Sequence, residues 1–377
     1  MFVIVSRTWE VMLMVTQHSH LVRIIEQDFG LLSTGKHASL FTLTNLHGMQ
    51  VKITNFGGII VSILTHDKTQ RLADVVLGYD RVSDYENDSY YLGAIIGRYA
   101  GRIDKGQFVL NGKQIQLTLN AADSQLHGGT EALNKQLWQA TSSQNENSST
   151  VSLTYTSPDG EEGFPGEVKF TVKYQLTDLN ELVVEYFAQT DQNTIINLTQ
   201  HSYFNLLGHD SGNIHQHKVS INADYFLPMS EKAYPTGQIK SVDNTAHNFT
   251  QQKCLADDIN NIEDEQIRIG LGFDNYWLLN DNAIAMNEYA AQVKENISGR
   301  RMTIYTDQPS LILYTANYID GSHYGKNNVC YQKRAALCLE PQRANNKENG
   351  VALENCLLTP DQPFYSKTRY VFDVKGS

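Results

Sequence analysis

Short segments in which apolar and polar residues alternate make up most of the chain after residue 38. Residues 41–67 divide into two or three such segments at Asn, Gly and Asp, and residues 150–190 alternate on both sides of a Gly/Pro-rich loop. Later segments cover residues 218–229, 302–318 and 335–342. Alternation with a period of two is typical of strands that bury one face. The pattern predicts an all-β protein, a sandwich or barrel rather than a parallel sheet with crossover helices.

Turn and helix signals fit the same fold class. Asn111-Gly112 between two strand-like runs predicts a tight hairpin. Helical periodicity is rare, and residues 283–295 (AIAMNEYAAQVKE) form the one candidate, a short helix. The polar stretches 141–150 and 343–350 are expected to be surface loops.

The strand pattern has no compositional break at which a second domain could start. Residues 38–377 are therefore expected to form a single β-sandwich domain. Residues 1–37 are interpreted either as a flexible N-terminal extension or as an over-called start of the chain. Their apolar run is interrupted by Arg7 and Glu10 and has no small-residue cleavage site, so they make a poor signal peptide.

Composition excludes some classes of partner. The formal net charge is −11 and no Lys/Arg-rich block is present, which makes nucleic acid and anionic membrane surfaces improbable partners. The four cysteines form no CxxC pair and no metal-type grouping with histidines. In a chain of 377 residues with its own core, unpaired thiols are favoured over disulfides, and a cytoplasmic location is expected.

The residues that could carry chemistry are polar groups placed beside glycines or inside apolar runs. They are Arg98 and Arg102 in GRYAGRIDKGQF, His127 in DSQLHGGTEALNKQLW, His201 in NLTQHSYFNLLG, Asp274 in LGFDNYWLL and Glu340 in AALCLEPQR. Taken singly, a histidine in such a run is more often a hydrogen-bonded core residue, and a strand-end carboxylate is more often salt-bridged. No GxSxG, Walker loop, HExxH or GxGxxG after a strand is present. Arg, His, Asp and Glu suit acid–base chemistry on a neutral polyhydroxy ligand.

From Ser39 to Val374 the chain resembles the aldose 1-epimerases (galactose mutarotases). Nine motifs stand in the family's order: NFGGIIVSIL, ADVVLGYD, YLGAIIGRYAGRI, QLHGG, SPDGEEGFPGEV, NLTQHSYFNL, GFDNYWLL, YTANYIDG and LCLEPQ. The resemblance implies a β-supersandwich with few short helices. It also implies interconversion of the α and β anomers of free aldohexoses, such as galactose and glucose, by a monomer or homodimer with no cofactor and no metal.

The resemblance assigns roles to six residues of this chain. Glu340 resembles the family's general base and His201 its general acid. Arg102, His127 and Asp274 match residues that hold the sugar hydroxyls, and Gln308 in TDQPSLILYTAN matches a further polar group near the site.

The chain also departs from the family pattern. Many members have Asn where Gly101 stands, and the lead-in NAADSQLHGG and the segment 343–355 differ from the usual patterns. These departures leave the preferred sugar open.

Two other functions share this fold. A hexose-6-phosphate 1-epimerase would need a cationic phosphate pocket, for which Arg98, Lys105 and Arg343 are candidates. A non-catalytic carbohydrate-binding sandwich domain would need no general acid or base, although both His201 and Glu340 are present.

Overall fold

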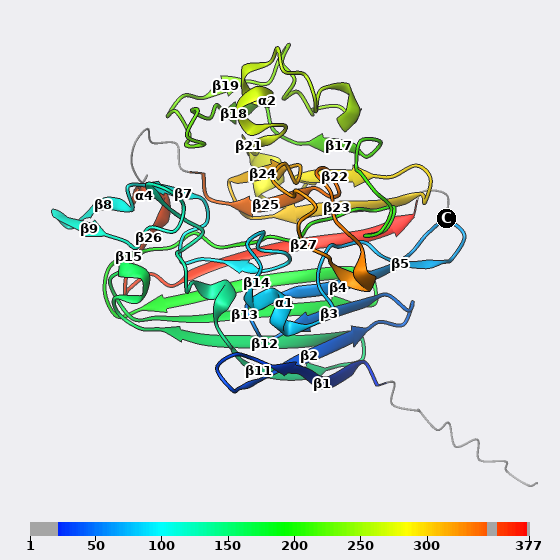
Figure 1. Ribbon diagram of the computed structural model, residues 1–377, viewed down its shortest axis with the longest axis horizontal. Helices are drawn as coiled ribbons and strands as arrows, with labels where there is room; N and C mark the ends of the chain where they lie inside the picture. Colours follow the sequence, from blue (N-terminus) through cyan, green and yellow to red (C-terminus); the bar gives the residue numbers. More distant parts are fainter. Residues whose placement is uncertain (1–21, 345–352, 375–377) are drawn as a thin grey trace, which may run out of the picture.

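The computed structural model describes residues 22–344 and 353–374. Most of the strand residues belong to three antiparallel sheets (Figure 1). The largest has nine strands in the order β11 (Gln139–Gln144), β12 (Ser148–Ser157), β13 (Val168–Thr177), β14 (Glu181–Thr190), β27 (Phe364–Val374), β23 (Arg300–Thr306), β22 (Ala291–Lys294), β17 (Lys218–Ile221) and β20 (Lys253–Cys254). Figure 1 shows its long strands running across the middle of the molecule.

Two five-stranded sheets accompany the large one. The first contains β1 (Ile24–Leu31), β2 (His37–Thr44), β3 (Gln50–Thr54), β4 (Ile60–His66) and β5 (Leu72–Asp74). The second has the order β19 (Lys240–Ser241), β18 (Tyr225–Leu227), β21 (Asp274–Leu278), β24 (Ser310–Tyr314) and β25 (Cys338–Gln342). We call this second one the site sheet.

Short strand pairs and short helices complete the fold. The pairs are β6 (Ile95–Ile96) with β16 (Thr199–Gln200), β7 (Arg102–Asp104) with β10 (Ser124–Leu126), β8 (Gln107–Leu110) with β9 (Lys113–Gln116), and β15 (Thr194–Ile195) with β26 (Leu357–Leu358). The α-helices are α1 (Val82–Glu86), α2 (Glu265–Gly270), α3 (Asp281–Ile284) and α4 (Leu353–Cys356), and the 3₁₀ turns are η1 (Leu133–Lys135), η2 (Glu161–Gly163), η3 (Leu255–Asp257) and η4 (Lys326–Asn328). None of the described helices is long and apolar enough to cross a lipid bilayer.

The all-β prediction is confirmed, and so are its local signals. Along β13 the residues alternate between buried and less buried positions, as expected for a strand that covers a core with one face. Residues 41–67 contain β3, β4 and the second half of β2. Asn111 and Gly112 connect β8 to β9 with φ angles of 51° and 75°, the left-handed pair of a type I′ turn.

Two expectations about individual segments were wrong. Helix α3 covers only the start of 283–295, and Ala291–Lys294 form β22 because this segment pairs with β17 and β23 in the large sheet. The polar stretch 141–150 belongs mostly to the β11–β12 hairpin rather than to a loop. β11 is an edge strand of the large sheet and is mostly exposed, so a polar sequence is tolerated there. Of the expected loop 343–350, residues 345–350 lie outside the described residues.

The expected N-terminal extension is shorter than 37 residues. Ile24–Leu31 form β1, which pairs with β2. The buried Arg23 donates to Asp178 at 2.6 Å, so this part of the chain is anchored to the large sheet's β13–β14 turn. The remaining residues of the predicted extension, 1–21, lie outside the described residues.

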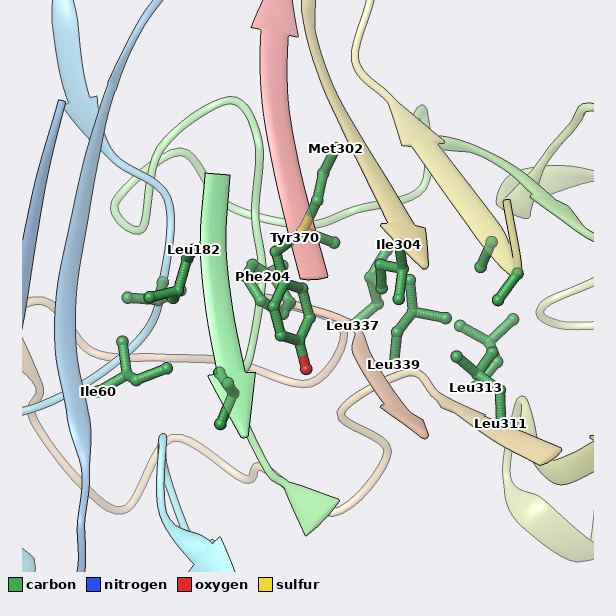
Figure 2. Close-up of a cluster of buried hydrophobic side chains, with 14 of the residues drawn as sticks. Ile60, Leu182, Phe204, Met302, Ile304, Leu311, Leu313, Leu337, Leu339 and Tyr370 are labelled. Carbon is green, nitrogen blue, oxygen red and sulfur yellow. The ribbon is translucent and has the colours of Figure 1, made fainter. Parts of the chain in front are cut away.

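The core explains why the segments that form β24 and β25 are nearly continuous apolar runs in the sequence. Figure 2 shows Leu311 and Leu313 of β24 and Leu339 of β25 in one cluster with Ile304 and Tyr370 of the large sheet. The alternate residues of β24 and β25 point to the opposite face of the site sheet. Both faces of these strands are buried, one against the core and the other around a cavity.

Candidate active site

The register of the site sheet places two rows of side chains on its cavity face. Strand β24 lies between β21 and β25, so each row contains one residue from each strand in the order β21, β24, β25. The rows are Tyr276, Ile312 and Glu340, and then Asp274, Tyr314 and Cys338. All of these except Cys338 line a cavity of about 280 Å³, a volume suited to a small ligand.

The opposite wall comes from the two short strand pairs near residues 95 and 102. His201 follows β16, where its N–H donates to the carbonyl of Ala94 at 2.9 Å. Arg102 begins β7 and pairs with Leu126 of β10, which places His127 beside it. His127 has a φ of 56°, a left-handed conformation that the two following glycines also adopt. This bend turns the imidazole into the cavity.

His201 and Glu340 meet at the base of the cavity. His201 Nε2 lies 3.6 Å from Glu340 Oε1, and the residues are 4% and 2% exposed. Glu340 Oε2 is buried and has no hydrogen-bond partner among the described residues. Tyr203 stacks on the His201 ring at a centroid distance of 5.0 Å and holds its plane. A buried carboxylate oxygen without a partner is costly, which is typical of a group kept for a ligand.

Cys338 lies against the other ring nitrogen of His201. Its Sγ is 3.6 Å from Nδ1, and both residues are buried. Burial raises the pKa of Cys338, with a further contribution from Glu340, so the sulfur remains a thiol that can donate to Nδ1. A neutral His201 that accepts from Cys338 carries its proton on Nε2, the nitrogen that faces Glu340.

Burial decides where the protons of this pair lie. It lowers the pKa of His201 to about 4 and raises the pKa of Glu340 well above its usual range, the second effect being increased by the charge of Asp274. Both shifts follow from the cost of a charge in a desolvated site. The free pair therefore holds one proton over a wide pH range, on the carboxyl group.

Arg102, His127 and Asp274 surround the remaining space. The side chains of Arg102 and Asp274 have no hydrogen-bond partner among the described residues, although both line the cavity. The pKa of Asp274 is raised to about 6 by burial, against the opposing effect of Arg102. The N–H of Gly101 donates to His127 Nδ1 at 3.3 Å, which leaves Nε2–H of a neutral His127 free to donate. Two donors and one acceptor are thus available to a polyhydroxy ligand.

Gln308 does not lie with the other five predicted residues. It is buried in the connection from β23 to β24, and its side chain donates to Asp307 Oδ1 at 3.0 Å. It lines a second depression, together with Arg343 and Tyr365. The residues of the same segment that line the cavity are Ile312 and Tyr314, and Ile312 stands next to Glu340 in the sheet. Gln308 is therefore excluded from direct contact with a ligand in this cavity.

The three candidate phosphate-binding cations also lie elsewhere. Arg98 is buried and uses all five of its N–H donors on the carbonyls of Ser157, Pro158, Pro165 and Gly166 and the hydroxyl of Ser157. Arg343 donates to the carbonyl of Asn355 beside the second depression. Lys105 is not part of the cavity wall, and among the described lining residues Arg102 is the one Lys or Arg side chain.

His201, Cys338 and Glu340 are close enough together to hold a metal ion, with one ligand atom from each within 4.8 Å of the others. Such an ion would occupy the nitrogen and oxygen that proton transfer requires. We expect treatment with EDTA to leave activity unchanged when it is followed by polarimetry. A loss of activity after EDTA treatment that added zinc restores in the wild type, but not in Cys338→Ala, would contradict this prediction.

Sequence reasoning missed the aromatic residues of the wall. Tyr91, Tyr276, Tyr314 and Tyr318 line the cavity together with Tyr203. All five tyrosines stand in the quoted motifs, but a tyrosine in a strand is most often a core residue. Only the register shows that they face the ligand space.

Comparison with known proteins agrees with this geometry. A sequence model of the family described as aldose 1-epimerase matches residues 39–371. The chain belongs to the aldose 1-epimerase family. Galactose mutarotase of Sus scrofa is 39% identical over 326 residues, which is 86% of this chain and 92% of that protein. Aldose 1-epimerase of Escherichia coli (strain K12) is 32% identical and covers 90% of this chain and 96% of its own length.

The fold is also similar to solved structures of this family. Galactose 1-epimerase from Lactobacillus acidophilus NCFM superposes with a TM-score of 0.83 at 28% identity, covering 93% of this chain and 98% of that one. An aldose epimerase homologue from C. elegans gives a TM-score of 0.80 at 26% identity, covering 89% of this chain and 99% of that one. The predicted family, fold class and isomerase class are confirmed.

Proposed function

We propose that the protein interconverts the α and β anomers of free aldohexoses, with galactose and glucose as substrates. The observation that carries this proposal is the His201–Glu340 pair, 3.6 Å apart at the base of a cavity with unpaired hydrogen-bonding groups on its walls. The names of the similar proteins support the same reaction.

Catalysis is assigned to proton transfer by the pair. Glu340 takes the proton of the C1 hydroxyl while His201 protonates the ring oxygen, and the bond between C1 and the ring oxygen breaks. The open-chain aldehyde rotates about the C1–C2 bond. The ring oxygen then attacks the other face of C1, Glu340 returns its proton to the carbonyl oxygen, and His201 recovers the proton from the ring oxygen. Arg102, His127 and Asp274 hold the other hydroxyls, so that only C1 turns.

The position of the single proton changes during the reaction. Ring opening needs a carboxylate at Glu340 and an imidazolium at His201, and it ends with a protonated Glu340 and a neutral His201. In the free pair the proton lies on Glu340, because burial lowers the pKa of His201 and raises that of Glu340. The proton must therefore pass from Glu340 to His201 before the ring opens, and ring opening returns the pair to the arrangement that burial favours.

The rate should depend on pH through Asp274 and through the pair. As pH falls through about 6, Asp274 gains a proton and becomes a poorer acceptor, so kcat/KM begins to fall. Below about pH 4 the pair holds two protons and has no base, so the fall becomes steeper. At high pH, loss of the last proton from Glu340 removes the acid.

The measurement is kcat/KM from about pH 3 to about pH 9, corrected for spontaneous mutarotation. Asp274→Asn should lower kcat/KM near neutrality and remove the first step. A step near pH 6 that persists unchanged in Asp274→Asn would contradict the assignment.

Free sugars should be used better than their 6-phosphates. A phosphate brings nearly two negative charges into a cavity that already contains Asp274 and Glu340 and has Arg102 as its lining cation. The test is polarimetry on fresh α-D-galactose, α-D-glucose and glucose 6-phosphate at matched ionic strength. We expect kcat/KM for the phosphate to be at least about 10-fold lower.

The polarimetric experiment also separates the alternatives. Higher kcat/KM on the phosphate would favour a hexose-6-phosphate 1-epimerase. Sugar binding without any interconversion would favour a carbohydrate-binding domain. Either result would contradict the proposed reaction.

We further propose a cytoplasmic enzyme, monomeric or homodimeric, whose partner is the monosaccharide alone. Free thiols at Cys254, Cys330 and Cys338 suit a reducing compartment. The net charge of −11 argues against a nucleic-acid partner. A single domain over residues 38–377, to which the paired strand β1 adds Ile24–Leu31, is also part of this proposal.

A further inference from the structure

We propose that the hydroxyl of Tyr276 binds the sugar, and that the missing side chain at Gly101 is what makes room for it. The inference rests on the proposed function, since it adds a substrate-binding and specificity-determining residue to the same site. None of the roles assigned above involves either residue as a sugar contact.

Tyr276 lies on the cavity face of the site sheet, in the same row as Glu340. It follows Asp274 by two residues on β21, so both side chains lie on the cavity face. Across the sheet it stands opposite Ile312, which stands opposite Glu340. Ile312 offers no hydrogen bond, so in this row Tyr276 and Glu340 are the polar groups that a ligand meets.

The hydroxyl of Tyr276 has no protein partner. The residue is 4% exposed and lines the cavity, yet no hydrogen bond to its Oη is found among the described residues. Two neighbouring tyrosines differ in this respect. Tyr203 donates to the carbonyl of Tyr90 at 2.8 Å, and the hydroxyl of Tyr314 accepts from the N–H of Tyr318 at 3.1 Å. A buried phenol without a partner is unfavourable unless a ligand or water supplies one.

The chemistry of the group suits a sugar hydroxyl. Burial, together with the charges of Glu340 and Asp274, raises the pKa of Tyr276, so the phenol stays protonated. A phenol can donate to one sugar oxygen and accept from another. It adds a neutral contact to those of Arg102 and Asp274 without placing another charge beside the catalytic pair.

Gly101 is complementary to this hydroxyl. A Cβ atom built at residue 101 would lie 2.8 Å from Tyr276 Oη, closer than side chains tolerate. The φ angle of 96° at Gly101 also disfavours any other residue. A side chain at position 101 would therefore displace the hydroxyl of Tyr276 from its present position. Because residue 101 is glycine, the space beside it is available to the hydroxyl of Tyr276.

The test is a double-mutant cycle with Tyr276→Phe and Gly101→Ala, assayed by polarimetry and by calorimetric sugar binding. Tyr276→Phe should raise KM and the dissociation constant for galactose about 5- to 10-fold, with kcat changed less than about 3-fold. Gly101→Ala should raise KM in the wild-type background and do so less when residue 276 is Phe, because the hydroxyl that it displaces is already absent. Backbone strain at position 101 is present in both backgrounds and cancels in this comparison.

Tyr225→Phe, which removes the exposed hydroxyl of a tyrosine on the adjacent strand β18, is the matched control and should leave both constants unchanged. Unchanged binding in a folded Tyr276→Phe variant, or a Gly101→Ala effect equal in both backgrounds, would overturn the inference. Calorimetry separates it from the proposed function. If the wild-type protein binds sugar without interconverting anomers, the proposed reaction fails while the binding role of Tyr276 is still measured.

Discussion

Glu340→Gln is expected to bind galactose with near-normal affinity and to lose about 10³- to 10⁴-fold in kcat. The amide has the size and shape of the carboxyl group, so the cavity and the contacts of the sugar are preserved. It cannot accept the proton of the C1 hydroxyl, and it cannot return one when the ring closes. Because Glu340 Oε2 has no partner among the described residues, replacing it breaks no hydrogen bond within the protein.

The measurement is polarimetry for kcat and calorimetry for binding. Glu263→Gln, which makes the same change at an exposed position, is the control and should behave as the wild type. A Glu340→Gln enzyme with turnover near that of the wild type would exclude this residue as the base.

His201→Asn is expected to lower kcat by about 10²- to 10⁴-fold. Asparagine can still donate a hydrogen bond toward the ring oxygen, but it cannot transfer a proton. The space left by the imidazole adjoins the ligand cavity, next to Glu340 and Cys338. Added imidazole should therefore restore part of the lost rate in His201→Asn and should have no such effect on Glu340→Gln.

The control for this variant is His47→Asn at an exposed position on the first five-stranded sheet's β2–β3 turn. Equal weak stimulation of all variants by imidazole would mean buffer catalysis rather than rescue. Turnover of His201→Asn close to that of the wild type would remove His201 from the mechanism.

Local rules explain why the strands could be predicted. The alternation in residues 168–177 and the Asn111-Gly112 turn depend on neighbouring residues, and the structure contains both as expected. The helix prediction for 283–295 failed because the second half of this segment is a strand only through pairing with β23, which follows it, and with β17, which is distant in sequence. Alanines and a glutamate favour a helix locally, but burial of Ala291 and Val293 in the large sheet prevails.

The site could be predicted only in part, because a motif identifies residues but not the side of the sheet on which they lie. His201, Glu340, Arg102, His127 and Asp274 stand in recognisable motifs, and the structure brings them to one cavity. Gln308 stands in such a motif too, yet it lies outside the cavity, since position in a motif does not specify the face of the sheet.

The sequence by itself determined the fold class, the family and most of the polar residues of the site, because these depend on residue types and their local order. Tertiary structure alone decided which side chains share the cavity and which protons they hold. The register of β21, β24 and β25 sets Tyr276 and Ile312 beside Glu340. Burial lowers the pKa of His201 and raises that of Glu340. Cross-strand contact and desolvation arise only when segments far apart in the chain pack together.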